Sequence, residues 1–213
     1  MKREEVLAGI DYLSRRDPVL REVIERVGNF ALQRERDIFT ALVSAIISQQ
    51  ISTGAARSIY GRLCERVGGE KGLLDGLLKL SAEELRGVGV SPQKQRYLKD
   101  LAEKVSGGEV HLAALGEMSN DEIIAELTKI KGIGVWTVHM LLIFSLGRLD
   151  VFPGGDFGVR TAIQRLYRKR KLPSKPAQLR KFEKLWQPYA SIASWYCWRS
   201  LEFEEYKRKQ AKP

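Results

Sequence analysis

Apolar residues recur along the chain at a spacing close to 3.6 residues, and the alternation typical of β-strands is scarcely seen. Glycine-containing breaks interrupt this pattern at VGNF (27–30), VGGEKG (67–72), GVGVSP (87–92), SGGEV (106–110), KGIG (131–134) and FPGGD (152–156). The pattern therefore predicts an all-α protein of roughly ten helices of ordinary length.

Two segments are too apolar for a surface helix. Residues 37–60 predict one helix at the buried centre of a lobe, with Gln49 and Gln50 near its end. From the residues alone, this glutamine pair is best read as solvated helix surface. The segment YASIASWYCWRSLE, which follows Pro188, predicts a buried C-terminal helix.

Composition and charge point to a folded protein with a polyanionic partner. The chain has 213 residues, 44% of them hydrophobic, enough for one core or two small lobes. Its 36 Lys and Arg outnumber 26 Asp and Glu, and residues 107–213 hold 18 basic against 11 acidic side chains. Nucleic acid is the commonest partner of such a balance, although an acidic membrane surface or plain solubility is also consistent with it. The basic run from Arg165 to Lys184 is either a solvated face or a phosphate track.

The cysteines and histidines do not predict a metal site. Two cysteines, Cys64 and Cys197, exclude a disulfide scaffold and a four-cysteine zinc or iron–sulfur site. His111 and His139 have no metal-ligand partner at a useful spacing. The N-terminus carries Glu4 and Glu5 instead of an apolar signal, and no apolar stretch reaches membrane-span length, so we expect a cytosolic, soluble protein.

Residues 128–147 predict a helix end, a short GIG turn and a new apolar helix. Gly132 and Gly134 allow backbone N–H groups to approach a ligand closely, and the helix N-terminus that follows suits a phosphate oxygen. With Lys131 beside the turn, this is the arrangement of a helix-hairpin-helix that grips a DNA backbone without reading bases. The alternative is an ordinary linker between two helices, and Trp136 fits either core packing or the DNA side.

Residues 150–167 place an acid where a DNA-binding face would not need one. A Pro-Gly-Gly turn delivers Asp156 to the start of a helix. Asp is a favoured N-cap residue, which alone would explain it, and Val159 three positions later leaves no capping box. The two roles are compatible, because a helix N-terminus also stabilises a carboxylate that does chemistry.

Taken together, these segments resemble a known family. KIKGIGVWTVHML (129–141) followed by DVFPGGDFGVR (150–160) resembles the helix-hairpin-helix and Gly/Pro…Asp motif of the DNA glycosylase superfamily, in detail its 3-methyladenine DNA glycosylase II (AlkA-like) branch. FTALVSAIISQQIS (39–52), LRGVGVSPQKQRYLKDLA (85–102) and WQPYASIASWYCW (186–198) resemble further segments of that branch. The similarity covers residues 35–200.

The resemblance implies a single glycosylase unit over residues 1–213, with two helical lobes and a DNA cleft between them. We expect one lobe of central helices over about 35–120, and a second lobe over about 1–34 and 121–213 that carries the hairpin. The resemblance implies no iron–sulfur cluster and no other cofactor. It does imply a site for a structural monovalent cation, held by backbone carbonyls of the hairpin.

The resemblance also implies roles by position. Asp156 falls where the family has its essential aspartate, and Gln50 where it inserts a side chain into the gap left by the extracted base. Trp136 stands where bifunctional relatives carry a Schiff-base lysine, which implies a monofunctional enzyme. The residues implied to hold DNA phosphate are Gly132, Gly134, Thr137 and Lys131. Those expected to line the base pocket are Trp136, Phe39, Phe157 and Trp198.

The implied activity is hydrolysis of the N-glycosidic bond of alkylated purines such as 3-methyladenine, by base flipping and a carboxylate. The expected partner is double-stranded DNA with damaged bases, and no membrane partner is expected. We expect a monomer that acts at the nucleoid of a prokaryote or in a eukaryotic nucleus. Two alternatives stay open. One is a non-catalytic helix-hairpin-helix protein that binds DNA or senses lesions, and the other is the same fold acting on hypoxanthine or oxidised bases.

Overall fold

The structure is a computed structural model that describes the backbone of residues 2–32 and 37–210, with side chains through residue 202. These residues form helices and no strand, which confirms the all-α prediction. The α-helices are α1 (Arg3–Arg16), α2 (Pro18–Val27), α3 (Ile38–Ser48), α4 (Thr53–Val67), α5 (Leu73–Lys79), α6 (Ala82–Gly87), α7 (Pro92–Ser106), α8 (Asn120–Leu127), α9 (Val135–Phe144), α10 (Phe157–Leu166), α11 (Pro176–Trp186) and α12 (Ala190–Gln210). Two 3₁₀ helices, η1 (Glu70–Gly72) and η2 (Leu112–Ala114), complete the set.

The chain divides into two compact units, the central unit and the terminal unit. The central unit is Arg34–Leu141, and the terminal unit joins Met1–Gln33 to Leu142–Pro213. Helix α9 begins in the former and ends in the latter. The expected lobe boundary near residue 120 is therefore wrong, because residues 121–141, hairpin included, group with the central helices.

Hydrogen bonds to α7 explain why the hairpin belongs to the central unit. The Lys131 backbone N–H donates to Asp100 Oδ2 at 2.8 Å, and the Lys131 ammonium lies 3.2 Å from Oδ1. Lys104 Nζ donates to the Lys129 carbonyl at 2.5 Å. Burial alone would raise the pKa of Asp100, but the bonds from Lys131 and Lys104 outweigh it and hold that pKa below its ordinary value.

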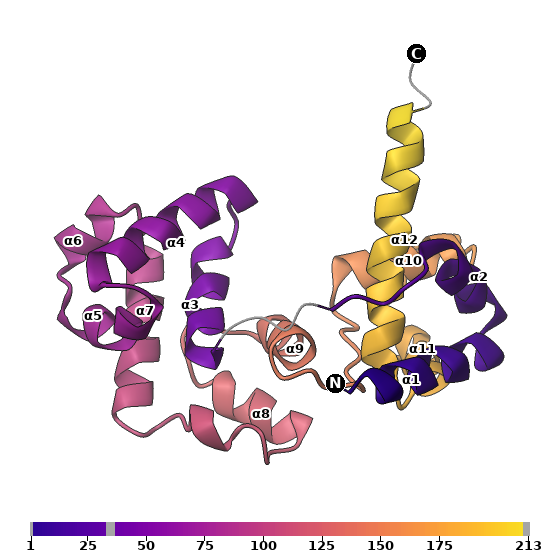
Figure 1. The fold of residues 1–213 in the computed structure, drawn as a ribbon, viewed down its shortest axis with the longest axis horizontal. Helices are drawn as coiled ribbons and strands as arrows, with labels where there is room; N and C mark the ends of the chain where they lie inside the picture. Colours follow the sequence, from indigo (N-terminus) through magenta and orange to yellow (C-terminus); the bar gives the residue numbers. More distant parts are fainter. Residues whose placement is uncertain (1, 33–36, 211–213) are drawn as a thin grey trace. The chain divides into compact units, whose positions relative to one another are not determined.

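In the central unit, α3 contacts both α4 and α7 (Figure 1). Asp37 caps its N-terminus by accepting from the Thr40 N–H at 3.2 Å. The prediction of a single helix over 37–60 is wrong. Helix α3 ends at Ser48, and α4 starts at Thr53 with Ser52 as its N-cap. The break falls at Gln50, whose φ of 57° is left-handed and incompatible with a continuous right-handed helix.

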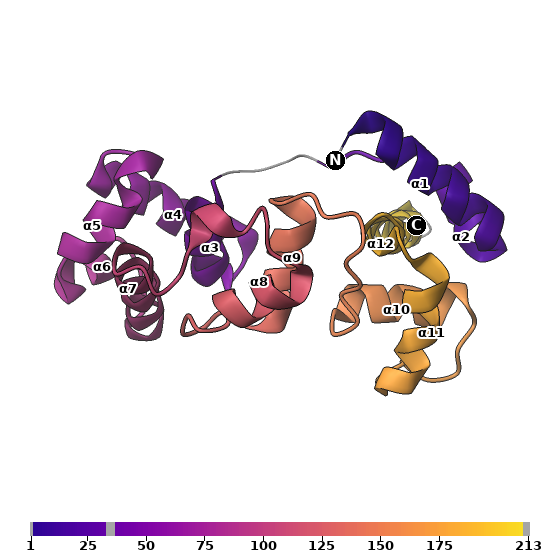
Figure 2. The ribbon, with the colours of Figure 1, turned by 90° about the horizontal axis from the view of Figure 1, so that it is seen from below.

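In the terminal unit, α12 is the helix around which the others pack, as the view along its axis in Figure 2 shows. Its first half is buried, which confirms the predicted C-terminal helix. Asp17, the N-cap of α2, accepts hydrogen bonds from the indole of Trp186 at 2.9 Å and from the hydroxyl of Tyr167. Leu13, Leu20, Ile163, Trp186 and Tyr196 lie in the core of this unit.

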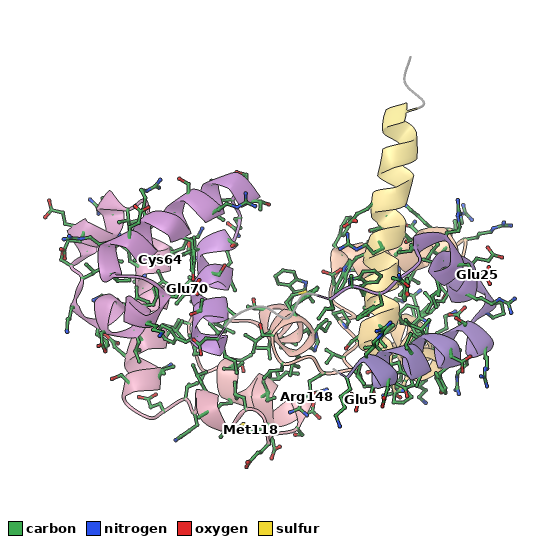
Figure 3. All side chains as sticks on the ribbon, viewed as in Figure 1. Glu5, Glu25, Cys64, Glu70, Met118 and Arg148 are labelled. Atoms are coloured by element: carbon green, nitrogen blue, oxygen red, sulfur yellow. The ribbon has the colours of Figure 1, made fainter. Side chains whose placement is uncertain are left out.

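Side chains fill the space between the helices within each unit (Figure 3). The two thiols belong to different units: Cys64 lies on α4 and Cys197 on α12, where it is buried. Burial raises the pKa of the Cys197 thiol well above its ordinary value, so that thiol is unreactive. Among the described residues, none of the helices combines the length and hydrophobicity needed to cross a bilayer.

Candidate active site and nucleic-acid interface

Asp156 is a buried carboxylate at the N-terminus of α10. Its backbone N–H donates to the Pro153 carbonyl at 2.8 Å, which closes the Pro-Gly-Gly turn that the sequence predicted. Its Oδ1 accepts from the Val159 N–H at 2.8 Å, so Asp156 is an N-cap, and its exposed fraction is only 8%. The helix dipole and this N–H stabilise the carboxylate at this point of the fold.

A second donor to Asp156 comes from another helix. The Trp198 indole on α12 donates from Nε1 to the same Oδ1 at 2.8 Å. A helix cap does not need this bond, since Val159 already satisfies the capping geometry. The Trp198 ring stacks on Phe144 with centroids 5.6 Å apart and an interplanar angle of 28°. Trp198 therefore orients the carboxylate and is itself held by an aromatic neighbour.

Gly158 makes the approach of α12 possible. A Cβ at this position would lie 2.9 Å from Trp198 Cδ1 and 3.1 Å from Asp156 Oδ1. Any larger residue at position 158 would displace the indole from the carboxylate. Gly158 was not among the site residues predicted from the sequence, although a glycine inside the first turn of a helix is costly enough to have been a signal.

The aromatic residues expected to line a base pocket lie in different settings. Phe157, directly after Asp156, exposes 70% of its surface, and Trp136 on α9 exposes 52%. Phe39 on α3 is buried, with 7% of its surface exposed. The exposed rings of Phe157 and Trp136 are available for stacking with a ligand.

The hairpin between α8 and α9 contains two glycines with different constraints. Gly132 has a φ of +83°, and a Cβ there would lie 2.2 Å from the Tyr97 ring. A Cβ on Gly134 would meet nothing within 4 Å. The Gly134 carbonyl accepts from the Val138 N–H at 3.1 Å, so a residue without a side chain caps the N-terminus of α9. Gly132 is required by packing, whereas Gly134 leaves the helix N-terminus open to a ligand.

The other residues expected at the phosphate are divided between surface and interior. Lys131 is exposed beside the hairpin, and Thr137 is buried in the first turn of α9. Gln50 is exposed on the turn between α3 and α4. Its neighbour Gln49 donates from Nε2 to the Gly132 carbonyl at 2.8 Å. The glutamine pair is therefore not plain solvated helix surface, because it adjoins the hairpin.

A basic surface covers the end of α10, the loop after it and α11. Its nine members are exposed, and none forms an ion pair with a described residue. Glu183 is the one acid between positions 157 and 190. The basic surface consists of Arg165, Arg168, Lys169, Arg170, Lys171, Lys175, Arg180, Lys181 and Lys184.

The structure thus collects the expected site residues into two groups, one in each unit. Asp156, Phe157 and Trp198 lie together in the terminal unit. The central unit holds Gln50, Lys131, Gly132, Gly134, Trp136 and Thr137. Gly158, Tyr97 and the bond made by Gln49 are the functional features that sequence reasoning did not find.

The described residues offer few donor groups for a metal ion. Within the described part of the chain, His, Cys, Asp and Glu side chains do not gather in a set of three or more that could hold an ion. In the hairpin, the carbonyls of Lys129 and Gly132 accept from Lys104 and Gln49. Each of these two carbonyl oxygens keeps a second lone pair, so the bonds do not exclude a monovalent cation at the hairpin.

Comparisons with known proteins point to one family. The model of the HhH-GPD superfamily base excision DNA repair protein matches residues 43–188. DNA-3-methyladenine glycosylase 1 of Schizosaccharomyces pombe is 32% identical over 97% of this chain and 94% of its own length. The crystal structure of DNA-3-methyladenine glycosidase from Bacillus halodurans has a TM-score of 0.83 at 36% identity, over 92% of this chain and 91% of that one.

The S. pombe enzyme has also been solved as a complex with abasic DNA. That structure matches with a TM-score of 0.79 at 32% identity, over 92% of this chain and 97% of that one. The family model spans well over half of the present chain, and the matched residues include both the hairpin and Asp156. The chain therefore belongs to the HhH-GPD superfamily of base excision DNA repair proteins.

Proposed function

We propose that the protein is a monofunctional DNA glycosylase that hydrolyses the N-glycosidic bond of alkylated purines such as 3-methyladenine. The observation that carries the proposal is the geometry of Asp156, a buried carboxylate oriented by donors from two different helices. The names of the S. pombe and B. halodurans relatives support this substrate class.

The chemistry assigns Asp156 an electrostatic role. Cleavage of a glycosidic bond builds positive charge on the sugar, as in an oxocarbenium ion. A preorganised carboxylate stabilises that charge without reorganising during the reaction. Asp156 can also orient or deprotonate the attacking water. The N–H of Val159 and the indole of Trp198 fix the position of Oδ1, which leaves the carboxylate in one orientation for this work.

The leaving group explains the need for aromatic surface. An N-alkylated purine is cationic and leaves readily, so discrimination can rest on stacking the electron-poor base on aromatic faces. Each such contact contributes about 0.5–2 kcal/mol. Trp136 and Phe157 offer exposed rings for it, and Trp198 offers a ring already committed to Asp156.

The hairpin and Gln50 supply DNA binding in this proposal. The open N-terminus of α9 takes a phosphate, with Lys131 adding charge and Thr137 fixing the first turn. The target base is inside the duplex and must be flipped out, and Gln50 fills the gap that it leaves. Trp136 cannot form a Schiff base, so the enzyme releases the base without cutting the strand.

We assign the enzyme no iron–sulfur cluster and no cofactor, because a chain with two cysteines in different units lacks the thiolates for a cluster. A cation, if held by the hairpin, supports the phosphate grip and takes no part in bond cleavage. The protein acts as a monomer on duplex DNA, in the nucleoid or the nucleus.

The test is release of free base from methylated duplex DNA by the wild type and by Asp156→Asn. Asn is as good an N-cap as Asp, so the fold should be kept while the charge is lost. The matched control is Asp37→Asn, because Asp37 caps α3 through the Thr40 N–H. We expect 3-methyladenine and 7-methylguanine to be released by the wild type and the control but not by Asp156→Asn.

Two results would contradict the proposal. Undiminished release by Asp156→Asn would return Asp156 to the role of a helix cap. Absence of release from methylated, hypoxanthine-containing and oxidised duplexes, with binding intact, would make the protein a non-catalytic DNA-binding module. Release of hypoxanthine alone would keep the mechanism and change the substrate.

A further inference from the structure

The turn between α3 and α4 is held in place from two sides. At the C-terminal end of α3, the Lys94 ammonium donates to the Ile47 carbonyl at 2.6 Å. Two residues later, the Gln49 amide donates to the Gly132 carbonyl at 2.8 Å. The partners come from α7 and from the hairpin, so both bonds join the turn to segments distant in sequence.

The carbonyl that Gln49 binds belongs to a rigid point of the hairpin. Gly132 has a left-handed φ and packs directly on the Tyr97 ring, which leaves no room for a Cβ. The preceding N–H, of Lys131, is fixed to Asp100. The amide of Gln49 therefore reaches an anchor and not a mobile loop.

Gln50 needs such support. Its φ of 57° is uncommon for a residue with a side chain, and glutamine has no local hydrogen bond that favours it. Strained backbone persists only where surrounding contacts hold it. The bonds of Lys94 and Gln49 fall on the residues just before Gln50, and Ser52 caps α4 just after it.

We infer that Gln49 is a positioning residue that ties the Gln50 turn to the hairpin, so that insertion into the base stack and the grip on the phosphate occur at a fixed separation. The inference rests on the proposed roles of Gln50 and the hairpin. Lys94 supports the same turn from its other side. All of these residues belong to the central unit, so the coupling lies within one compact body.

The inference predicts a specific kind of non-additivity. If Gln49 acts only through Gln50, its removal costs nothing once the Gln50 side chain is gone. If Gln49 instead contributes to general stability, the loss caused by its substitution adds to the loss caused by substituting Gln50. Substitution of Gln49 then also lowers the affinity for any duplex. A double-mutant cycle separates the two.

The experiment uses the full chain with Gln49→Met, which keeps the length of the side chain and removes the N–H donor without adding charge. The partner variant is Gln50→Ala, and the matched control is Gln164→Met, a half-buried glutamine of the terminal unit. The probe is a duplex carrying a stable abasic-site analogue beside 2-aminopurine, whose fluorescence reports loss of base stacking. Single-turnover base release, affinity for undamaged duplex and thermal midpoint are measured on the same proteins.

We expect Gln49→Met to lose most of the fluorescence change and to slow base release on the order of tenfold, since misplaced groups lose rate steeply. Affinity for undamaged duplex and the thermal midpoint should match those of Gln164→Met. The double variant should behave like Gln50→Ala alone, and Lys94→Met should give the same non-additive pattern.

Wild-type behaviour of Gln49→Met, or a loss that adds fully to that of Gln50→Ala, overturns the inference. An unaltered response of Gln50→Ala also overturns it, because the turn would then present nothing to DNA. Since the fluorescence change needs no bond cleavage, a wild type that inserts Gln50 but releases no base refutes the proposed glycosylase and leaves the positioning role of Gln49 intact.

Discussion

The indole nitrogen of Trp198 lies 2.8 Å from Oδ1 of Asp156, so the orientation of the candidate catalytic carboxylate depends on a helix far along the chain. Trp198→Phe keeps a ring to stack on Phe144 and removes the donor. A hydrogen bond to a charged group contributes about 1.5–3 kcal/mol, which predicts a fall in single-turnover base release of about 10- to 100-fold. The control is Trp195→Phe on the same helix, whose indole packs on Phe30. Equal losses in both variants would argue against a special role for Trp198.

Gly158→Ala should impair catalysis through the same pair. The added Cβ would lie 2.9–3.1 Å from Trp198 and Asp156, and one of them has to move. Ala is a better helix former than Gly by up to about 1 kcal/mol, so we expect a small change in stability alongside a large loss of base release. Gly155→Ala is the control, because a Cβ there meets nothing within 4 Å. Full activity of Gly158→Ala would show that the contact tolerates displacement.

The two hairpin glycines should respond differently to alanine. In Gly132→Ala the methyl group collides with the Tyr97 ring at a left-handed φ, so we expect lost DNA affinity and unfolding at lower urea. In Gly134→Ala the methyl group meets open space, so we expect only the modest loss of stability that a poorer N-cap causes, while the phosphate is blocked. Fluorescence anisotropy with duplex DNA and urea titration measure the two effects. A stable, fully binding Gly134→Ala would exclude close phosphate contact at this point.

Low pH should lower the free energy of unfolding through Glu126, which lies on α8 just before the hairpin. The ammonium of Lys129 and the backbone N–H of His111 lower the pKa of Glu126 to about 2, from an unfolded value near 4.5. A depressed pKa adds stability above the unfolded pKa, and this contribution is lost as the pH falls from about 4.5 to about 2. Glu126→Gln should therefore be less stable than the wild type at pH 6, and the difference should vanish near pH 2. Urea unfolding across this range, followed by circular dichroism, measures it; a difference independent of pH would contradict the assignment.

The basic surface predicts a salt dependence of DNA binding. Replacing Lys169, Arg170 and Lys171 by Ala should reduce the slope of log affinity against log salt by up to about 2.7, at about 0.9 for each phosphate contact. Three exposed arginines that are already ion-paired, Arg15, Arg66 and Arg199, serve as the control set, and their replacement should change the slope little. An unchanged slope in the first set would assign these cations to solubility.

Local features of the fold could be predicted from the sequence. The 3.6-residue period and the glycine breaks indicated helices, and the Pro-Gly-Gly turn placed Asp156 at a helix start. The helix expected over 37–60 was wrong because no glycine or proline marks the break at Gln50. Bonds to Lys94 and Gly132 hold that turn, and a local pattern does not contain them.

Long-range contacts account for the rest. The lobe boundary was misplaced because the tie between Lys131 and Asp100 joins residues 31 positions apart. The bond between Asp156 and Trp198 spans 42 positions, and no periodicity predicts which aromatic residue of the last helix reaches the acid. The resemblance to a family indicated Asp156 and the hairpin, and the structure shows the contacts with Trp198 and Asp100 that support them.

The division of the terminal unit between the two ends of the chain has a consequence for synthesis on the ribosome. The central unit is continuous in sequence and is translated before α12. The unit that contains Asp156 joins Met1–Gln33 to Leu142–Pro213, so it can fold only after α12 has left the exit tunnel. A nascent or prematurely terminated chain that stops before α12 carries the hairpin and Gln50 but lacks the indole that orients the acid. Synthesis of α12 is thus a prerequisite for assembly of the acid site.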